Sequence, residues 1–232
     1  MKLAIGNWQS AIKIKPEFTP KTMVLTKYAP ETLKRSGLYK ELSRKRRRWN
    51  LRKQLSVANP VRVVLGAGQT SFPGWFHTDR ELLDVTSPAD WSALFEPDSI
   101  DSVLSEHMLE HLTEDEARVA VTECYRYLKP GGLFRVAVPD GYRRDPAYVR
   151  EASPPNDGHK VLYNIDTLSA LLQSAGFTTT PLEYFDAQEQ FHAQPWTIED
   201  GVIQRSARFD TQRDFERGDL FYTSLIVDAR KQ

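Results

Sequence analysis

The chain has 232 residues, of which 40% are hydrophobic and 27% charged, with 31 basic side chains against 31 acidic ones. This composition supports a folded core and excludes collagen-like, coiled-coil and wholly disordered chains. No apolar run reaches the roughly 20 residues of a transmembrane helix, and the start, Met1–Gly6, turns polar too soon for a signal peptide. The single cysteine, Cys124, excludes an internal disulfide, an Fe–S cluster and a cysteine-based zinc site. We therefore expect a globular, cytoplasmic protein.

The charge is distributed unevenly. Residues 1–58 hold 15 Lys/Arg and 3 Asp/Glu and are expected to form a basic N-terminal extension with one or two short strands before residue 38. A helix is predicted from Leu38 to Leu55, with an apolar stripe of Leu38, Leu42, Trp49 and Leu55. Such a helix can contact nucleic acid, an anionic membrane or an acidic substrate. We favour the alternative, in which the extension folds onto its own acidic domain or onto a second subunit of a homo-oligomer.

The second domain, residues 59–232, begins after Asn59-Pro60. The apolar, β-branched run Val61–Leu65 predicts a buried parallel strand. Further short strands are predicted at Phe76–Asp79 and Ile100–Ser105.

Helices and strands alternate through the rest of the chain. Thr113 and Glu116 form a capping box before a helix that is expected to stop at Lys129–Gly132. The strand Leu133–Val138 and an amphipathic helix, Ile165–Ala175, follow. The last two strands are predicted at Thr178–Phe185 and Phe221–Asp228, around a polar excursion from 186 to 219. This order predicts an α/β fold with a doubly wound, Rossmann-like and mostly parallel sheet.

The first strand runs into Gly66-Ala67-Gly68, whose backbone N–H groups a polar or anionic ligand can approach closely. Ser71 stands where a dinucleotide fingerprint has its third glycine. Asp79 ends the second strand, 13 positions after Gly66, and a carboxylate there suits ribose hydroxyls. The pattern indicates a nucleoside site with a shortened first connection.

Five segments occur in an order that resembles the class I S-adenosylmethionine (SAM) dependent methyltransferases, most closely their compact bacterial members. They are residues 64–68 (VLGAG), 74–79 (GWFHTD), 83–86 (LDVT), 105–112 (SEHMLEHL) and 128–132 (LKPGG). The resemblance covers about residues 60–232 and implies SAM as cofactor and a terminal antiparallel strand at 221–228.

The resemblance also implies roles for individual residues. Gly66, Ala67 and Gly68 would face the methionine part of SAM, and Asp79 would hold its ribose. Asp84 and Val85 would flank the adenine, while Ser105, Glu106 and His107 would line the cofactor and open onto the acceptor.

Methyl transfer is an in-line displacement in which alignment can supply most of the acceleration. His107 is the first candidate for a general base, because an imidazole accepts a proton near neutrality, and Glu106 is the second. Around the same rim, Asp140, Tyr142, His159 and Tyr163 are candidate acceptor-binding residues. Residues 154–159 are expected to form a lid, and Arg205 and Arg208 to wall the pocket, unless 186–219 is a solvated hairpin.

Two other functions stay open. His107, Glu110 and His111 spell the H-x-x-E-H signature of inverted zinc proteases. We expect no metal there, because Thr113 starts a new helix two residues later and the two histidines need not share one helix. The chain could also be a non-catalytic methyltransferase-like binding or scaffold protein. The acceptor that we expect is a small molecule or a glycan-related metabolite, and not nucleic acid.

Overall fold

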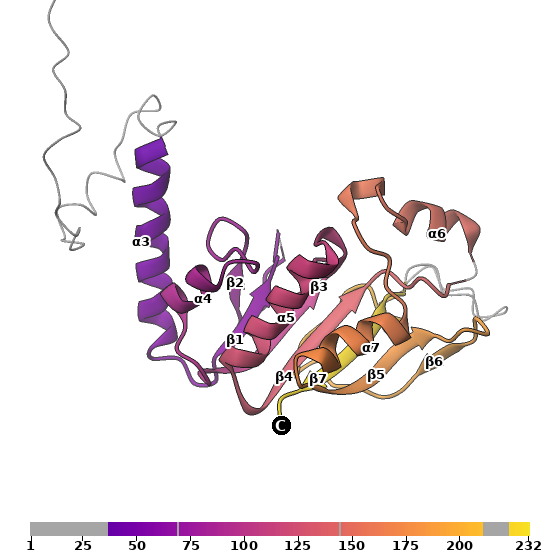
Figure 1. The fold of residues 1–232 in the computed structure, drawn as a ribbon. Coiled ribbons are helices and arrows are strands. Elements are labelled where there is room, and N and C mark those ends of the chain that lie inside the picture. The colour runs from indigo at the N-terminus through magenta and orange to yellow at the C-terminus, as the bar shows by residue number, and fades with distance from the viewer. Residues whose placement is uncertain (1–36, 69, 144, 211–222) are drawn as a thin grey trace, which may run out of the picture. The chain divides into compact units, whose positions relative to one another are not determined.

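The computed structural model describes residues 37–68, 70–143, 145–210 and 223–232, which Figure 1 shows as a ribbon. The chain divides into two compact units, Met1–Arg47 and Arg48–Gln232. The helix expected in the basic segment is present as α3, Gly37–Leu55. The short strands expected before it lie outside the described residues.

A seven-stranded sheet is the centre of the second unit, with the strand order β2-β1-β3-β4-β7-β5-β6. The strands β2, β1, β3 and β4 are parallel, and β7 runs antiparallel between β4 and β5. Their bounds are β1 Arg62–Leu65, β2 Phe76–Thr78, β3 Ile100–Glu106, β4 Leu128–Val138, β5 Thr178–Phe185, β6 Phe191–Ala193 and β7 Leu225–Arg230. The expected α/β class with a terminal antiparallel strand is confirmed.

The helices of this unit are short, and several have side-chain caps. Their bounds are α4 Pro88–Leu94, η1 Leu109–His111, α5 Glu114–Tyr127, α6 Pro146–Ala152, η2 Asn156–Gly158 and α7 Ile165–Ser174. The predicted capping box of α5 is present, since Thr113 and Glu116 bond each other's backbone N–H groups. Throughout the described segments, every helix falls short of the length and apolarity that crossing a bilayer requires.

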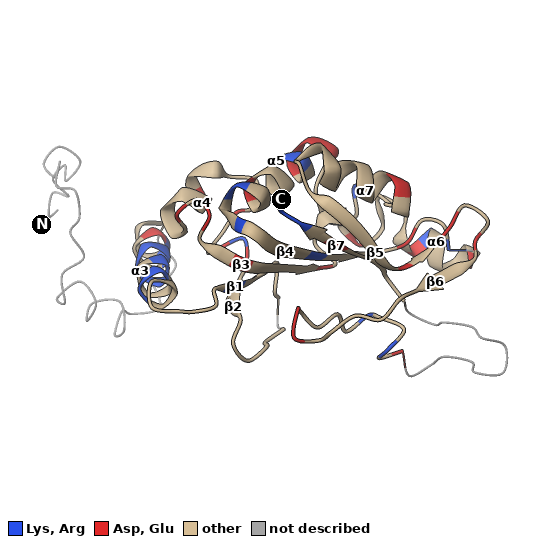
Figure 2. Ribbon diagram, turned by 90° about the horizontal axis from the view of Figure 1, so that it is seen from below, with Lys and Arg blue, Asp and Glu red and all other residues tan. Residues whose placement is uncertain are grey.

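The two faces of the sheet are covered differently. Helices α4, α5 and α7 lie on one face, as Figure 2 shows, where Val63 and Leu65 of β1 pack into the larger core cluster. Val64 points to the opposite face because side chains alternate along a strand. There it packs with Trp75, Trp196 and Ile203, so irregular segments cover this face.

A buried arginine holds one of these segments against the sheet. Arg135 of β4 is 1% exposed and bonds Asp228 of β7 through two parallel contacts of 2.7 and 2.9 Å. Its Nη1 donates to the carbonyls of Thr197 and Gly201, both at 2.7 Å. The ring of Trp196 lies 5.0 Å from the guanidinium carbon. Arg135, whose charge is paired with Asp228, therefore holds the segment 196–201 against this face of the sheet.

The sheet unit begins earlier than the boundary expected at residue 58. Leu51 and Leu55 are each 8% exposed and belong to its core cluster. Arg48 pairs with Asp90, and its Nε donates to the carbonyl of Leu82 at 2.7 Å. The compact unit therefore starts at Arg48, because the last two turns of α3 pack as part of it.

The apolar stripe expected on α3 is not buried as a whole. Leu38 and Trp49 are 68% and 44% exposed, whereas Leu51 joins Leu55 in the core. Arg52 pairs with Glu96 at 2.6 Å, within the same unit. Arg48 and Arg52 thus bind acidic side chains of their own unit.

Candidate functional site

The carboxyl ends of β1, β2 and β3 meet at one edge of the sheet because the three strands are parallel. Gly66 follows β1, Asp79 follows β2, and His107 follows β3. Three cavities open at this edge, and His107 lines all of them.

The first, which we call the Asp79 cavity, has a volume of about 370 Å³. It is lined by Gly66, Asp79, Arg80, Leu83, Asp84, Val85, Thr86, His107, Met108, His111, Leu112, Glu116 and Lys160. The lining thus combines apolar side chains with three carboxylates, Asp79 and Asp84 from the loop after β2 and Glu116 from α5. Four of the expected cofactor residues, Gly66, Asp79, Asp84 and Val85, come together here.

Both aspartate carboxylates are oriented by local hydrogen bonds. The Gly68 N–H donates to Asp79 Oδ1 at 2.9 Å. Asp84 Oδ1 accepts from the backbone N–H and the hydroxyl of Thr86, at 3.1 and 2.7 Å. A carboxylate has about four acceptor sites, so each keeps acceptor capacity for a ligand.

Gly66 is required by both its conformation and its surroundings. Its φ is +62°, and a Cβ there would lie 2.6 Å from Met108 Cγ. Gly68 has a φ of +55° but open space around the position of a Cβ. The turn after β1 is thus packed against the residue that follows His107.

A second cavity of about 270 Å³ extends from the glycine turn and is lined by Gly66, Ala67, Gly68, Glu106 and His107, among others. Glu106 Oε1 accepts the backbone N–H of Arg205 at 2.8 Å. This contact ties the segment over the second face of the sheet to the end of β3.

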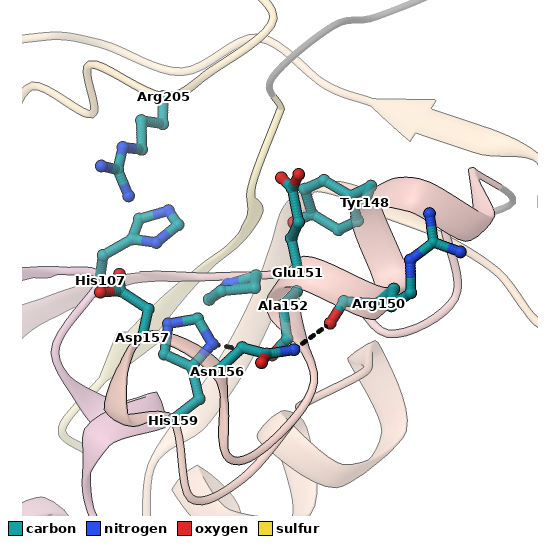
Figure 3. A pocket seen from close by; sticks show the side chains of 10 residues that line it. His107, Tyr148, Arg150, Glu151, Ala152, Asn156, Asp157, His159 and Arg205 are labelled. Carbon is teal, nitrogen blue, oxygen red and sulfur yellow. Dashed lines mark hydrogen bonds between the residues drawn. The ribbon is translucent and has the colours of Figure 1, made fainter.

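The third, which we call the His159 cavity, has a volume of about 460 Å³ and lies on the other side of His107. Its lining is mostly polar: His107, Pro139, Tyr148, Arg150, Glu151, Ala152, Asn156, Asp157, His159 and Arg205. Figure 3 shows His107 and Arg205 on one side, facing Tyr148 and Glu151 of α6 across the cavity. The expected lid, residues 154–159, supplies three of these side chains.

His107 is held in a strained and well-defined position. Its φ is +54°, a left-handed conformation that costs a non-glycine residue about 1 kcal/mol or more. Its Nδ1 lies 3.0 Å from Glu110 Oε1, and its Nε2 lies 2.8 Å from the hydroxyl oxygen of Ser224. The first contact is at ion-pair distance without hydrogen-bond geometry, since neither oxygen of Glu110 has a hydrogen-bond partner. A carboxylate beside Nδ1 favours the proton there, which leaves Nε2 as the basic nitrogen.

Two other expected site residues are structural in their contacts. Ser105 is fully buried within β3, and Asp140 is fully buried after β4, and neither lines any of the three cavities. The carboxylate of Asp140 accepts the N–H groups of Tyr142 and Phe185, at 3.0 and 2.8 Å. Burial nevertheless raises the pKa of Asp140 to about 6, because the loss of water outweighs these bonds.

The two tyrosines also lie outside these cavities. Tyr142 donates to Asp166 at 2.8 Å, and this bond raises the pKa of the phenol. Tyr163 is 4% exposed, and burial raises its pKa to about 12. Of the four residues expected to bind the acceptor, only His159 lines one of these three cavities.

Several contacts of the site carry no local sequence signal. Ser224 reaches His107 from 117 residues away, and Glu110 was considered only as part of a zinc motif. Of the two arginines expected to wall the pocket, Arg205 lines two of the three cavities and Arg208 lines none of them. Asp157 belongs to the expected lid, but nothing in the sequence singled it out.

Comparison with known proteins identifies the central segment. Residues 78–136 match the model of a family described as a methyltransferase domain. A "probable S-adenosylmethionine-dependent methyltransferase" of Mycolicibacterium smegmatis is 39% identical over 79 residues, which are 34% of this chain and 29% of that protein. The match thus spans less than a third of the length of this relative.

Solved structures give weaker similarity over more of the chain. A SAM-dependent methyltransferase from Archaeoglobus fulgidus is 14% identical, with a TM-score of 0.44 over 81% of this chain and 94% of the other. One from Mesorhizobium loti is 17% identical, with a TM-score of 0.44 over 79% of this chain and 97% of the other.

The matched residues include the last residue of β2, the loop with Asp84 and Val85, all of β3 and the following His107, and helix α5. These elements form most of the Asp79 cavity. Residues 78–136 are thus similar to the methyltransferase domain family, and a segment of 79 residues of this chain is similar to a SAM-dependent methyltransferase.

Proposed function

We propose that the protein transfers a methyl group from SAM to a polar small-molecule or glycan-related acceptor. The observation that carries this proposal is the pair of cavities that adjoin at His107, the Asp79 cavity and the His159 cavity. Two substrates that must react directly need neighbouring sites with a common boundary.

The side chains of the Asp79 cavity fit SAM. Asp79 can accept hydrogen bonds from ribose hydroxyls and Asp84 from an adenine amino group, while Val85 offers an apolar surface to the base. The backbone at Gly68 leaves room for the amino-acid part, since a Cβ there would meet nothing within 4 Å. The volume, about 370 Å³, is within the range of small-molecule sites.

The His159 cavity suits a polar acceptor. Its lining combines basic Arg150 and Arg205 with acidic Glu151 and Asp157. Hydroxyl, amine and carboxylate groups can all find partners on such a surface. A volume of about 460 Å³ holds a metabolite or a sugar more readily than a macromolecule.

SAM, when bound, supplies a methyl group that its sulfonium centre already activates. The protein has to align the acceptor, exclude water and, for a hydroxyl or ammonium acceptor, remove a proton. His107 is the base in this proposal, since its side chain lines both cavities and a carboxylate oxygen of Glu110 lies 3.0 Å from its Nδ1. Glu106 positions Arg205 beside it through the backbone bond.

The first test is calorimetry with S-adenosylhomocysteine (SAH), the demethylated form of the cofactor. One SAH should bind per chain, and Asp79→Asn should weaken it at least tenfold by removing the charge that holds the ribose. Asp186→Asn, which alters an exposed turn outside the cavities, is the matched control and should bind as the wild type does. Absence of SAH binding would contradict the proposed function.

The second test is turnover with a panel of sugars, polyols, amines and carboxylates, measured as SAH released. His107→Asn should lower kcat by about 10²–10⁴ and change SAH affinity far less, because it removes the base while asparagine tolerates the positive φ. Binding of SAH without turnover of any acceptor would favour the non-catalytic scaffold.

A further inference from the structure

A group of metal-ligating side chains lies in the wall between the two cavities. Glu110, His111 and His159 bring one carboxylate oxygen and two ring nitrogens within 4.8 Å of one another. His111 also lines the Asp79 cavity, His159 lines the His159 cavity, and Glu110 lines neither. The methyl-transfer proposal uses Glu110 beside His107 and His159 in the acceptor cavity but involves no metal ion, so the metal inference does not rest on it.

Glu110 is the unusual member of the group. Its side chain is 1% exposed, yet neither of its oxygens has a hydrogen-bond partner. Removing a carboxylate from water is costly unless hydrogen bonds, a counter-charge or a metal ion compensates it. His107 Nδ1 lies 3.0 Å from Oε1, which leaves Oε2 without a comparable contact. A bound cation would satisfy this second oxygen.

His159 is prepared as a ligand by its own contacts. Its Nδ1 lies 2.8 Å from the carbonyl oxygen of Ala152, which can only accept, so the ring proton is on Nδ1 and Nε2 keeps its lone pair. Metal-binding histidines almost always donate their second nitrogen in this way. The rings of His111 and His159 are 4.9 Å apart in an edge-to-face arrangement.

The backbone holds the ligands near one another. The N–H groups of Lys160 and Val161 both donate to the carbonyl of Glu110, at 2.7 and 3.3 Å. Gly158 leaves space beside His111, since a Cβ there would lie 3.7 Å from its Nδ1. The loop that carries His159 is thus fastened directly to η1, which carries the other two ligands.

We propose that Glu110, His111 and His159 bind a divalent transition-metal ion, with Zn²⁺ as the best-matched ion. Two histidines and one carboxylate are a set that zinc accepts in tetrahedral sites with an open fourth position. Ligand distances of about 2.0–2.2 Å bring tetrahedral ligand atoms to about 3.4 Å from one another. The side chains must therefore close in by roughly an ångström, which rotation of His111 on the short η1 can supply. Water or an oxygen of the acceptor would take the fourth position.

This site differs from the zinc motif in the sequence. The H-x-x-E-H pattern pairs His107 with His111 on one helix, but η1 starts at Leu109, after His107. His107 instead turns to Ser224, and His159 takes its place from a loop about 50 residues later. The two ligand sets differ in one histidine, His107 or His159, so an experiment can distinguish them.

The test uses untagged, full-length protein dialysed against a chelator, and calorimetric titration with Zn²⁺ alone. One ion per chain should bind. His159→Asn and His111→Asn should each weaken binding at least 100-fold, and Glu110→Gln should do the same while keeping its volume. His192→Asn, which alters an exposed histidine paired with Asp186, should change affinity less than threefold.

His107→Asn decides between the two ligand sets, since it should retain the ion if His159 is the ligand and lose it if the sequence motif is correct. Titration with Co²⁺ provides a second readout, because four-coordinate Co²⁺ absorbs strongly in the visible range and each ligand variant should lose this band. Circular dichroism confirms that the variants are folded. Less than about 0.2 ion per chain at saturation, or equal binding by all variants, would overturn the proposal, because the affinity of a metal site depends on the identity and number of its ligands. SAH binding needs no metal ligand, so it tests the proposed function separately.

Discussion

Replacing Gly66 by alanine tests how closely the turn after β1 is packed against the end of β3. At φ +62°, an alanine costs roughly 1–2 kcal/mol from backbone strain alone. Its Cβ would also lie 2.6 Å from Met108 Cγ and 3.0 Å from Met108 Cβ, inside any normal contact distance. Forcing an extra carbon into packed surroundings costs about 1–3 kcal/mol. Gly66→Ala should therefore destabilise the protein by about 2–5 kcal/mol.

Gly68→Ala is the matched control, because its φ of +55° is nearly the same and its Cβ would meet nothing within 4 Å. We expect a loss of about 1–2 kcal/mol there, from strain only. Urea unfolding measures both variants, and SAH calorimetry shows whether the displaced Met108 side chain narrows the cofactor cavity.

A double-mutant cycle completes the test, since Met108→Ala removes the closer contact, that with Cγ at 2.6 Å, and should recover part of the ~1–3 kcal/mol in the Gly66→Ala background. Equal destabilisation by the two glycine variants would refute the reasoning, as would a cycle without coupling between Gly66 and Met108.

Three further predictions concern buried charges. Because the pKa of Asp140 is raised to about 6 from its ordinary 3.8, its contribution to stability is greatest below pH 4 and falls by about 3 kcal/mol as the pH rises through 6. Unfolding of wild type and Asp140→Asn at pH 4 and 7 should show this loss only in the wild type, and parallel pH profiles would contradict it. Arg135→Met should cost about 3–5 kcal/mol in urea unfolding, because Asp228 is left buried without its partner, and a loss under 1 kcal/mol would disprove this role. Arg48→Gln should weaken SAH binding severalfold in calorimetry, because Arg48 supports the loop from Leu82 to Asp90 that carries Asp84. An unchanged affinity for SAH would show that this loop keeps its conformation without Arg48.

The sequence predicts the local parts of this fold well, because their signals are local. The capping box of Thr113 and Glu116 fixes the start of α5 to the residue. Alternation of apolar runs with helices gives the sheet, and Asp79 stands at the end of β2 as expected. Helix α4 was missed, although Ser87 and Pro88 are a recognisable cap and first residue. The expected turn at Lys129–Gly132 instead lies inside β4, since α5 ends at Tyr127 and the strand follows at once.

The site is predicted less well, because its geometry depends on contacts between distant segments. A residue after a strand can face the ligand or turn inward, and position alone does not decide between them. Asp79 faces the cavity, whereas Asp140 turns inward because Phe185 and Tyr142 offer it backbone N–H groups. The contact of His107 with Ser224 joins β3 to the start of β7, and only the sheet order brings the two together.

A crystal structure of the SAH complex tests the central claim most directly. The account predicts that the nucleoside lies in the Asp79 cavity, with ribose hydroxyls bonded to Asp79, adenine beside Val85 and the sulfur on the side of His107. Density for SAH in the His159 cavity or elsewhere on the molecule, with the Asp79 cavity unfilled at saturating ligand, would contradict it.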